Sequence, residues 1–217
     1  YTYKMAVGFC HSCYMTQLIN TVPYDKYIIP DEKGKTNYAF FSSTSKFMEK
    51  HFAKFAEEVE SRFLEGNKKV VEIGSNDGIM LKSFEDRKNV LGIEPSYNVA
   101  QIARKQSIET IADFFSQDLA RKIAKEKKAR AVISTNVFLN IIDIHDFVKG
   151  VQELLDEKGV FITEDPYLLD ILEKNSYDQI YDEHIWYFSL SSLSKLFPIY
   201  DMEIFDAKKQ EVHGGSM

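Results

Sequence analysis

Side chains suited to moving a proton gather between residues 164 and 188. His184 follows Asp182 and Glu183 directly, and Tyr181 stands three positions before it. An imidazole has an ordinary pKa close to neutrality, and a nearby hydroxyl can donate a hydrogen bond to an oxygen on which charge develops. The group therefore has the parts for removing a proton and for holding the oxyanion that results. A histidine beside acids on a loop is more often solvated or packed, so the residue types alone leave both interpretations open.

The stretch from Val70 to Gly78 has the composition of a ligand-binding turn after a buried strand. Gly74 and Gly78 lie four positions apart with Glu72 just before them, which gives the pattern ExGxxxG. Glycine lets a backbone turn tightly and approach a ligand with no Cβ in the way. A dinucleotide site leaves a helix N-terminus open for pyrophosphate, and an acidic flank would repel that group. The acidic pattern favours a ligand with an amine and a sulfonium, as in S-adenosylmethionine.

Further polar residues follow the next two expected strands. Glu94 stands 20 positions after Gly74, where a carboxylate can accept hydrogen bonds from both ribose hydroxyls. Asp113 can accept from an adenine amine, and Phe114 can cover the face of the ring. We therefore predict a nucleoside site that prefers S-adenosylmethionine to NAD. Its expected contacts are Glu72, Gly74, Asn76, Gly78, Glu94, Pro95, Asp113 and Phe114.

The elements that would position these residues follow from the hydrophobic pattern. We expect strands over 69–73, 90–93, 108–111, 129–134 and 159–164, and helices over 80–84, 99–105, 116–126 and 144–155. Short apolar strands that alternate with helices predict a doubly wound, Rossmann-like α/β sheet. A long helix is expected from Thr44 to Gly66, a helix over 190–197, and strands over 17–19 and 202–207.

The first 45 residues are expected to form a small N-terminal lobe, and residues 46–217 the main domain. The two cysteines of the chain, Cys10 and Cys13, have the CxxC spacing of metal or redox sites rather than of a disulfide framework. A tetrahedral zinc site would need two more ligands. Half of a zinc site, a redox pair and two ordinary thiols all remain open interpretations.

Composition excludes several classes of function. The chain has 33 acidic and 27 basic residues among 217, a net charge of -6, which argues against a nucleic-acid partner. It holds no apolar stretch of about 20 residues, so we expect no membrane span, and its N-terminus lacks the order of a signal peptide. A cytoplasmic protein is the resulting expectation, and the oligomeric state is left open.

Several strings of the sequence point to one family. They are EIGSNDGIML, EDPYLLDI, YDQIYDEH and VHGG, together with the CxxC near the start and SSTS before the first long helix. In these strings the chain resembles the sugar-nucleotide C-methyltransferases, which act on TDP-4-keto-deoxyhexoses. The resemblance spans nearly all of the chain, and YDQIYDEH is far more specific than the glycine turn that all class I methyltransferases share.

The resemblance implies a role for each matching residue. His184 is expected to remove the proton alpha to the C4 ketone, and the enolate carbon then attacks the methyl group of S-adenosylmethionine. Tyr181 and Glu183 are the expected partners of His184, and Tyr38 is the matching aromatic residue of the N-terminal lobe. We also expect cofactor contacts from Asn136, Ser42 and Ser43. His213 in VHGG either faces the same cleft or packs structurally.

The family pattern has three parts: an N-terminal zinc lobe, the methyltransferase domain and a C-terminal sugar-nucleotide-binding domain. This sequence shows only one CxxC, so we expect a second one upstream of Tyr1 and a structural zinc ion only if that half is present. We expect the C-terminal domain to be absent from this chain. Three alternatives remain open: an O- or N-methyltransferase of another small metabolite, a non-catalytic cofactor-binding protein and an NAD-dependent reductase. The sugar and the methylated carbon are also left open.

Overall fold

The computed structural model describes residues 3–217, so Tyr1 and Thr2, which begin the expected N-terminal lobe, lie outside the described residues. The contacts divide the chain into two compact units. The sheet unit comprises Tyr24–Ser134 and Glu153–Ile162, and the terminal unit comprises Tyr1–Pro23, Thr135–Gln152 and Thr163–Met217. This division differs from the expected boundary after residue 45, because residues 24–45 group with the sheet.

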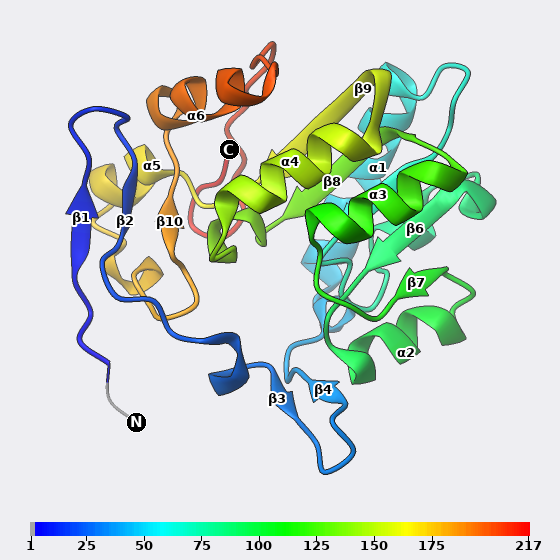
Figure 1. The fold of residues 1–217 in the computed structure, drawn as a ribbon, viewed down its shortest axis with the longest axis horizontal. Helices are drawn as coiled ribbons and strands as arrows, with labels where there is room; N and C mark the ends of the chain where they lie inside the picture. The colour runs from blue at the N-terminus through cyan, green and yellow to red at the C-terminus, as the bar shows by residue number, and fades with distance from the viewer. Residues whose placement is uncertain (1–2) are drawn as a thin grey trace. The chain divides into compact units, whose positions relative to one another are not determined.

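The sheet unit is built on five strands in the order β7-β6-β5-β8-β9 (Figure 1). Their bounds are β5 Val70–Ile73, β6 Val90–Ile93, β7 Thr110–Ile111, β8 Ala129–Thr135 and β9 Leu155–Glu164. β5 pairs in parallel with both β6 and β8, and β6 pairs in parallel with β7. Strand order reverses beside β5, so the carboxyl ends of β5 and β8 flank the switch point at which such sheets bind ligands. The predicted α/β sheet is confirmed.

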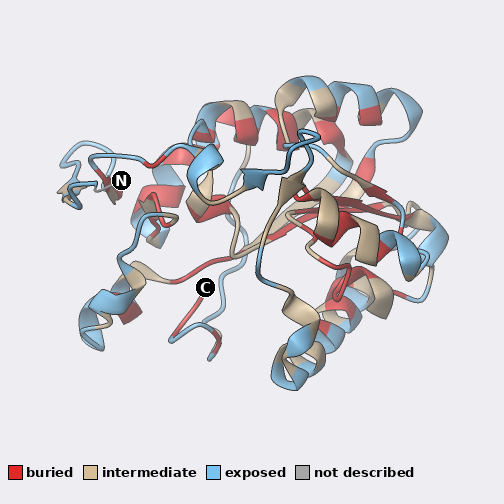
Figure 2. Cartoon of the chain, turned by 90° about the horizontal axis from the view of Figure 1, so that it is seen from below, coloured by how far each residue is buried: buried red, intermediate tan, exposed pale blue. Residues whose placement is uncertain are grey.

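Strands β5 and β6 form because they are short apolar runs that can be buried on both faces. Every residue of β5 and of β6 is buried, whereas β9 is buried only at its two ends. Buried segments, drawn in red, gather in the interior of the sheet unit (Figure 2). Helix α1, Lys46–Phe63, packs Phe52, Ala56 and Val59 into the same core. Burying a large apolar side chain contributes about 1.5–3 kcal/mol. The shared core therefore holds α1 against strands β5, β6 and β8.

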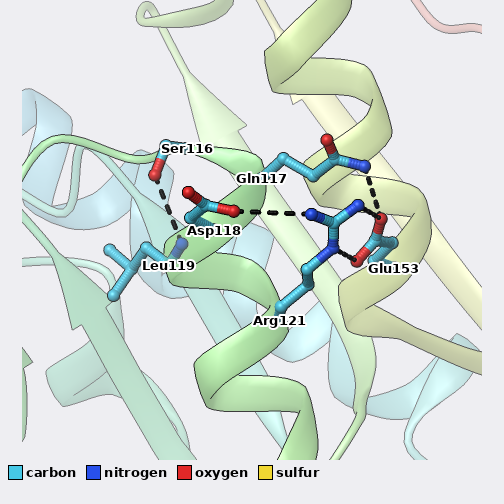
Figure 3. Close-up of polar contacts among 6 residues, drawn as sticks. All are labelled: Ser116, Gln117, Asp118, Leu119, Arg121 and Glu153. Carbon is cyan, nitrogen blue, oxygen red and sulfur yellow. Dashed lines mark hydrogen bonds and ion pairs between the residues drawn. The ribbon is translucent and has the colours of Figure 1, made fainter.

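Two further helices of the sheet unit are α2, Tyr97–Lys105, and α3, Gln117–Glu126. Ser116 caps α3 by accepting a hydrogen bond from the Leu119 N–H at 3.2 Å (Figure 3). Arg121 of α3 makes two hydrogen bonds to the carboxylate of Glu153, at 2.7 and 2.9 Å (Figure 3). The contacts of Arg121 tie α3 to Glu153, which lies two positions before the first residue of β9.

Some predicted elements are wrong or shorter. The expected helix over 80–84 is a single 3₁₀ turn, Leu81–Ser83, because the chain has only a few residues in which to return to β6. The expected strand over 202–207 is wrong. Residues 203–209 form no strand, and the Ile204 and Phe205 side chains are 36% and 62% exposed, so no sheet face covers them. The helix expected over 190–197 is confirmed as α6, Leu190–Leu196.

The terminal unit has a small antiparallel sheet in the order β1-β2-β10. Its strands are β1 Val7–Phe9, β2 Thr16–Leu18 and β10 Trp186–Tyr187, and its other helices are α4 Ile144–Leu154 and α5 Leu168–Glu173. Leu18 and Tyr187 pack with Ile171 of α5, and Phe138 stacks between Phe147 and Phe188 at 5.1 and 4.6 Å between ring centroids. In the described residues, we find no helix that is both long and apolar enough to cross a membrane.

Candidate functional site

The turn after β5 has the backbone geometry that its glycines predict. Gly74 and Gly78 have φ angles of 71° and 80°, and Asn76 between them has a φ of 47°. A left-handed conformation is uncommon for a residue other than glycine and concentrates at functional sites. A Cβ on Gly78 would lie 3.2 Å from the Cβ of Ala103 on α2, so glycine is also needed for the close approach. The turn is thereby held at the carboxyl end of β5.

Glu94 joins this turn to the next one. Its carboxylate accepts the Asn76 N–H at 3.0 Å and the Ser96 N–H at 2.8 Å. The side chain is 5% exposed, and its burial raises its pKa, while the hydrogen bonds from Ser96 and Asn76 act against that rise. Each oxygen keeps acceptor capacity beyond these bonds. Glu94 therefore stands at the carboxyl end of β6 with the chemistry that a ribose diol requires.

Two more acids are buried beside Glu94. Glu72 is 3% exposed, and its pKa is raised well above the ordinary value by burial and by the charges of Glu94 and Asp77. Glu72 Oε2 and Asp77 Oδ1 have no hydrogen-bond partner among the described residues. A buried polar atom without a partner is costly, so these oxygens favour a ligand that brings donors or positive charge. The residues fit the amine and sulfonium of S-adenosylmethionine, and Asp77 was missed by the sequence analysis.

Residues 42 and 43 are attached to the same turn. The Asn76 side-chain oxygen accepts the Ser42 N–H at 2.9 Å, and the Asp77 carboxylate accepts the Ser43 N–H at 3.1 Å. The Tyr38 backbone is bonded to Asn98 at the start of α2. Tyr38, Ser42 and Ser43 are therefore held at the carboxyl edge of the sheet, in the sheet unit.

Asp113 and Phe114 follow β7 at the same edge. The Asp113 carboxylate accepts the Phe114 N–H at 2.8 Å. The Phe114 ring is stacked on the ring of Tyr24, with centroids 5.1 Å apart and an interplanar angle of 27°. Phe114 remains 38% exposed, so part of its ring is open to a ligand. Tyr24 was not predicted, because no local pattern pairs residue 24 with residue 114.

His184 belongs to the terminal unit and is 2% exposed. Its Nδ1 lies 2.9 Å from the Gln179 carbonyl oxygen, which only accepts, so the proton of the neutral ring is on Nδ1. Nε2 is buried and has no hydrogen-bond partner among the described residues. Burial, with a smaller contribution from His213, lowers the pKa of His184 to about 4, although the hydrogen bond to Gln179 acts against the shift. At neutral pH the ring is uncharged with a free lone pair on Nε2, which is the state a general base needs.

Tyr181 lies against His184. The ring centroids are 3.9 Å apart, and the backbone N–H of His184 donates to the backbone carbonyl of Tyr181 at 3.1 Å. Burial and the charges of Glu183 and Asp182 raise the pKa of Tyr181 to about 12, so its hydroxyl stays protonated and can donate. Glu183 is half-buried between these two residues in the chain.

Asn136 and His213 take special backbone conformations elsewhere in the terminal unit. Asn136, directly after β8, has a φ of 53°, and its N–H donates to the Glu164 carbonyl at 2.7 Å. His213 is exposed with a φ of 50° and is followed by the left-handed Gly214. The charge of His213 contributes to the lowered pKa of His184 in the same unit.

A buried acid supports the segment beside His184. Asp165 is 4% exposed, and burial raises its pKa to about 7. It accepts hydrogen bonds from the Thr163 hydroxyl and, at 3.4 Å, from the Leu139 N–H. The Leu139 carbonyl in turn accepts the Ile185 N–H at 3.0 Å. The sequence placed Asp165 only within the range 164–188 of side chains suited to moving a proton. Its supporting role was not predicted, because the role depends on residues far apart in the sequence.

The cysteines give no complete metal site. Cys10 and Cys13 are exposed free thiols, and no group of three or more His, Cys, Asp or Glu side chains within residues 3–217 could hold a metal ion. Hydrogen bonds from the backbone of Cys13 and Ser12 lower the pKa of the Cys10 thiol. Two thiolates supply half of a tetrahedral zinc site, so zinc does not fit these residues alone and stays a prediction.

A parallel α/β sheet with an acidic glycine turn at its switch point and a carboxylate after the next strand defines a class I methyltransferase fold. Residues 44–205 match the family described as methyltransferase domain. The chain belongs to this family and is a class I methyltransferase domain, the class that uses S-adenosylmethionine.

Individual relatives agree with this assignment. C-methyltransferase NovU of Streptomyces niveus is 32% identical over 218 residues, which make up 99% of this chain and 50% of NovU. The chain thus spans about half the length of this curated relative. A SAM-dependent methyltransferase from Thermotoga maritima is similar in fold, with a TM-score of 0.53 and 20% identity over 73% of this chain and 74% of that one. The plantazolicin methyltransferase BpumL, solved in complex with SAH, has a TM-score of 0.50 and 16% identity over 68% of this chain and 61% of its own.

Proposed function

We propose that this protein is a C-methyltransferase that acts on a nucleotide-linked 4-keto-deoxysugar. The observation that carries the proposal is the state of His184: a buried neutral ring whose Nδ1 is bonded to a carbonyl and whose Nε2 has no partner among the described residues. Methylation of a carbon needs a base that removes a C–H proton. The similarity to the C-methyltransferase NovU supports the same chemistry.

The cofactor contacts are assigned by the chemistry of the side chains. Glu94 binds the ribose hydroxyls, and the buried acids Glu72 and Asp77 favour the positive end of the ligand. When bound, S-adenosylmethionine supplies a methyl group made electrophilic by the sulfonium. The residues that we assign to cofactor binding are Ser42, Ser43, Glu72, Gly74, Asn76, Gly78, Glu94, Pro95, Asp113, Phe114 and Asn136.

The proton transfer is assigned to His184. Its Nε2 accepts the proton from the carbon alpha to the ketone, and the electron pair of that C–H bond moves toward the ketone oxygen to form an enolate. The low pKa keeps the lone pair of Nε2 free throughout the neutral range, and it also makes the free ring a weak base. The transfer therefore depends on groups that stabilise the charged ring and the enolate. The positive ring that results is stabilised by the Gln179 carbonyl that faces Nδ1.

The partners of His184 act on the enolate oxygen. Tyr181 keeps its proton because its pKa is about 12, so its hydroxyl can donate a hydrogen bond to the oxygen that gains charge. We assign Tyr38 a second hydrogen bond to the acceptor, and Glu183 the orientation of the Tyr181 and His184 pair. Removing a single such donor typically costs about 10²–10³ in kcat.

The remaining expectations stand beside this proposal. Cys10 and Cys13 are proposed as half of a structural zinc site that two further ligands complete. We also propose a cytoplasmic protein whose partner is the nucleotide sugar rather than nucleic acid or a membrane. The net charge of -6 supports the part of this proposal that concerns nucleic acid.

The proposal is tested with methyl-labelled S-adenosylmethionine and a panel of nucleotide 4-keto-deoxysugars, analysed by mass spectrometry. We expect one panel member to gain the label with the wild type, and the label to disappear with His184→Ala while cofactor affinity is unchanged. His145→Ala is the matched control, because it removes another histidine of the terminal unit and should leave turnover intact. Full activity of His184→Ala would contradict the assigned base, and label in no panel member would contradict the substrate class.

A further inference from the structure

In the segment of the sheet unit that leads into helix α1, every second residue is bonded to polar groups of two turns. The Thr36 hydroxyl donates to the Pro95 carbonyl and accepts the Tyr97 N–H at 3.3 Å. Tyr38 is bonded to Asn98, and two positions further on the Phe40 carbonyl accepts from the Asn76 amide at 3.2 Å. Thr36 and Asn37 form strand β4, which pairs with β3, Ile29–Pro30. From residue 38 to residue 42 the chain lies in no strand, and the side chains of Asn98 and Asn76 are bonded to its backbone. These five residues are called the clasped segment below.

The contact between Asn98 and Tyr38 has a particular geometry. The Asn98 Oδ1 accepts the Tyr38 N–H at 3.1 Å, and the Asn98 Nδ2 donates to the Tyr38 carbonyl at 2.9 Å. In an extended residue the N–H and the C=O point to the same side, so one primary amide can satisfy both. The amide takes the place of a partner strand at this one residue. It fixes the position and the rotation of the backbone from which the Tyr38 side chain extends.

Asn98 itself is rigidly placed. It lies in the first turn of α2, after Ser96, whose N–H is bonded to Glu94. Its neighbour Val99 is completely buried, so the first turn of α2 is fixed in the core of the sheet unit. Asn98 thus links Tyr38 to the end of β6, although Tyr38 and Asn98 are 60 positions apart in the sequence.

We propose that Asn98 is a positioning residue for Tyr38: its amide holds the Tyr38 backbone in the one orientation from which the phenol serves the acceptor. The proposal rests on the proposed function, in which Tyr38 contacts the acceptor. Asn98 makes no contact with the acceptor itself. Residues 40–43 keep their own bonds to Asn76 and Asp77, so loss of the Asn98 amide affects Tyr38 locally and leaves the cofactor turn intact.

Two variants and one control isolate the amide. Asn98→Ala removes both hydrogen bonds, and Asn98→Asp keeps the acceptor for the Tyr38 N–H but loses the donor to its carbonyl. Asn89→Ala is the matched control, because Asn89 is also half-buried, makes side-chain hydrogen bonds to Asp86 and Lys127, and lies before β6 rather than after it.

The first readout is independent of turnover. Amide hydrogen exchange at Tyr38 should become about 5- to 10-fold faster in Asn98→Ala, since one backbone hydrogen bond contributes about 1 kcal/mol, and should be unchanged in Asn89→Ala. A fluorine NMR signal from 3-fluorotyrosine at position 38 should shift or broaden in Asn98→Ala only. Unchanged exchange and an unchanged signal would overturn the proposal, whatever the enzyme's substrate proves to be.

The second readout separates positioning from general stability. With the sugar nucleotide that the wild type methylates, kcat of Asn98→Ala should fall about 10- to 100-fold while the Kd for S-adenosylmethionine stays within twofold. In a Tyr38→Phe background the same substitution should have almost no effect, because the hydroxyl that it positions is gone. An equal fall in both backgrounds would overturn the proposal. A wild type that methylates no 4-keto-sugar would instead overturn the proposed function, and the exchange and NMR results would still decide the role of Asn98 toward Tyr38.

Discussion

The buried neutral state of His184 predicts a pH dependence of stability that can be measured without a substrate. The folded pKa is about 4, below the ordinary value of 6.5, because burial disfavours the charged ring and His213 adds to that effect. Between these two pH values the unfolded chain binds a proton that the folded protein does not. The stability that depends on the neutral ring is therefore complete above pH 6.5 and is lost as the pH falls toward 4.

The size of the loss follows from the same two values. At about 1.4 kcal/mol per pH unit, the gap between 6.5 and about 4 amounts to about 3 kcal/mol. Asp165 acts in the opposite direction. Its folded pKa of about 7 lies above the ordinary 3.8, so its contribution to stability is greatest below pH 3.8 and is lost as the pH rises toward 7. A comparison with a variant that lacks only the His184 titration removes the Asp165 effect.

The variant for this comparison is His184→Asn, whose amide can still donate to the Gln179 carbonyl and does not titrate. Denaturant unfolding of both proteins at a series of pH values from 7.5 to 4 gives the two free energies of unfolding. We expect the wild type to lose about 3 kcal/mol relative to His184→Asn between pH 6.5 and 4. A difference that stays constant within about 0.5 kcal/mol would refute the reasoning, because the ring would then titrate alike in the folded and unfolded states.

Three further predictions concern the sheet unit. Glu94→Gln should weaken S-adenosylmethionine binding about tenfold in calorimetry, because an amide cannot accept at both positions, and an unchanged Kd would remove Glu94 from the ribose site. Gly92→Ala should lower the free energy of unfolding by about 1–3 kcal/mol in denaturant melts, since its Cβ would lie 2.4 Å from Ser75 Oγ, and wild-type stability would show that Ser75 moves freely. Arg121→Ala should shift the thermal midpoint by less than about 2 °C, because its pair with Glu153 is half exposed, and a large fall would mark the pair as a main tie of α3.

The sequence was informative where a local pattern decides the structure. The β5 and β6 strands are short apolar runs, and burial on both faces of a parallel sheet selects such runs. The glycines of the turn after β5 and Glu94 after β6 were found by spacing along the chain. For His184 and Tyr181, the residue types left both a proton-transfer role and structural packing open, and the proton-transfer role stays a prediction.

Contacts between distant residues could not be predicted in this way. The clasped segment carries no hydrophobic period, and the bonds that hold it come from Asn76 and Asn98, tens of positions away. The strand expected over 202–207 failed for the reverse reason. Its alternating residues fit a strand, but a strand also needs a partner, and no local pattern states whether one is present.

The central claim, that the protein methylates carbon, is tested most directly by the fate of deuterium on the acceptor. The accepted nucleotide 4-keto-deoxysugar, carrying deuterium on both carbons beside the ketone, is incubated with the protein and S-adenosylmethionine in ordinary water, and the product mass is measured. Because a C–D bond must break before the new carbon bond forms, the methylated product should have lost at least one deuterium. A methylated product that keeps both deuterium atoms would contradict the claim and would place the methyl group on oxygen or nitrogen.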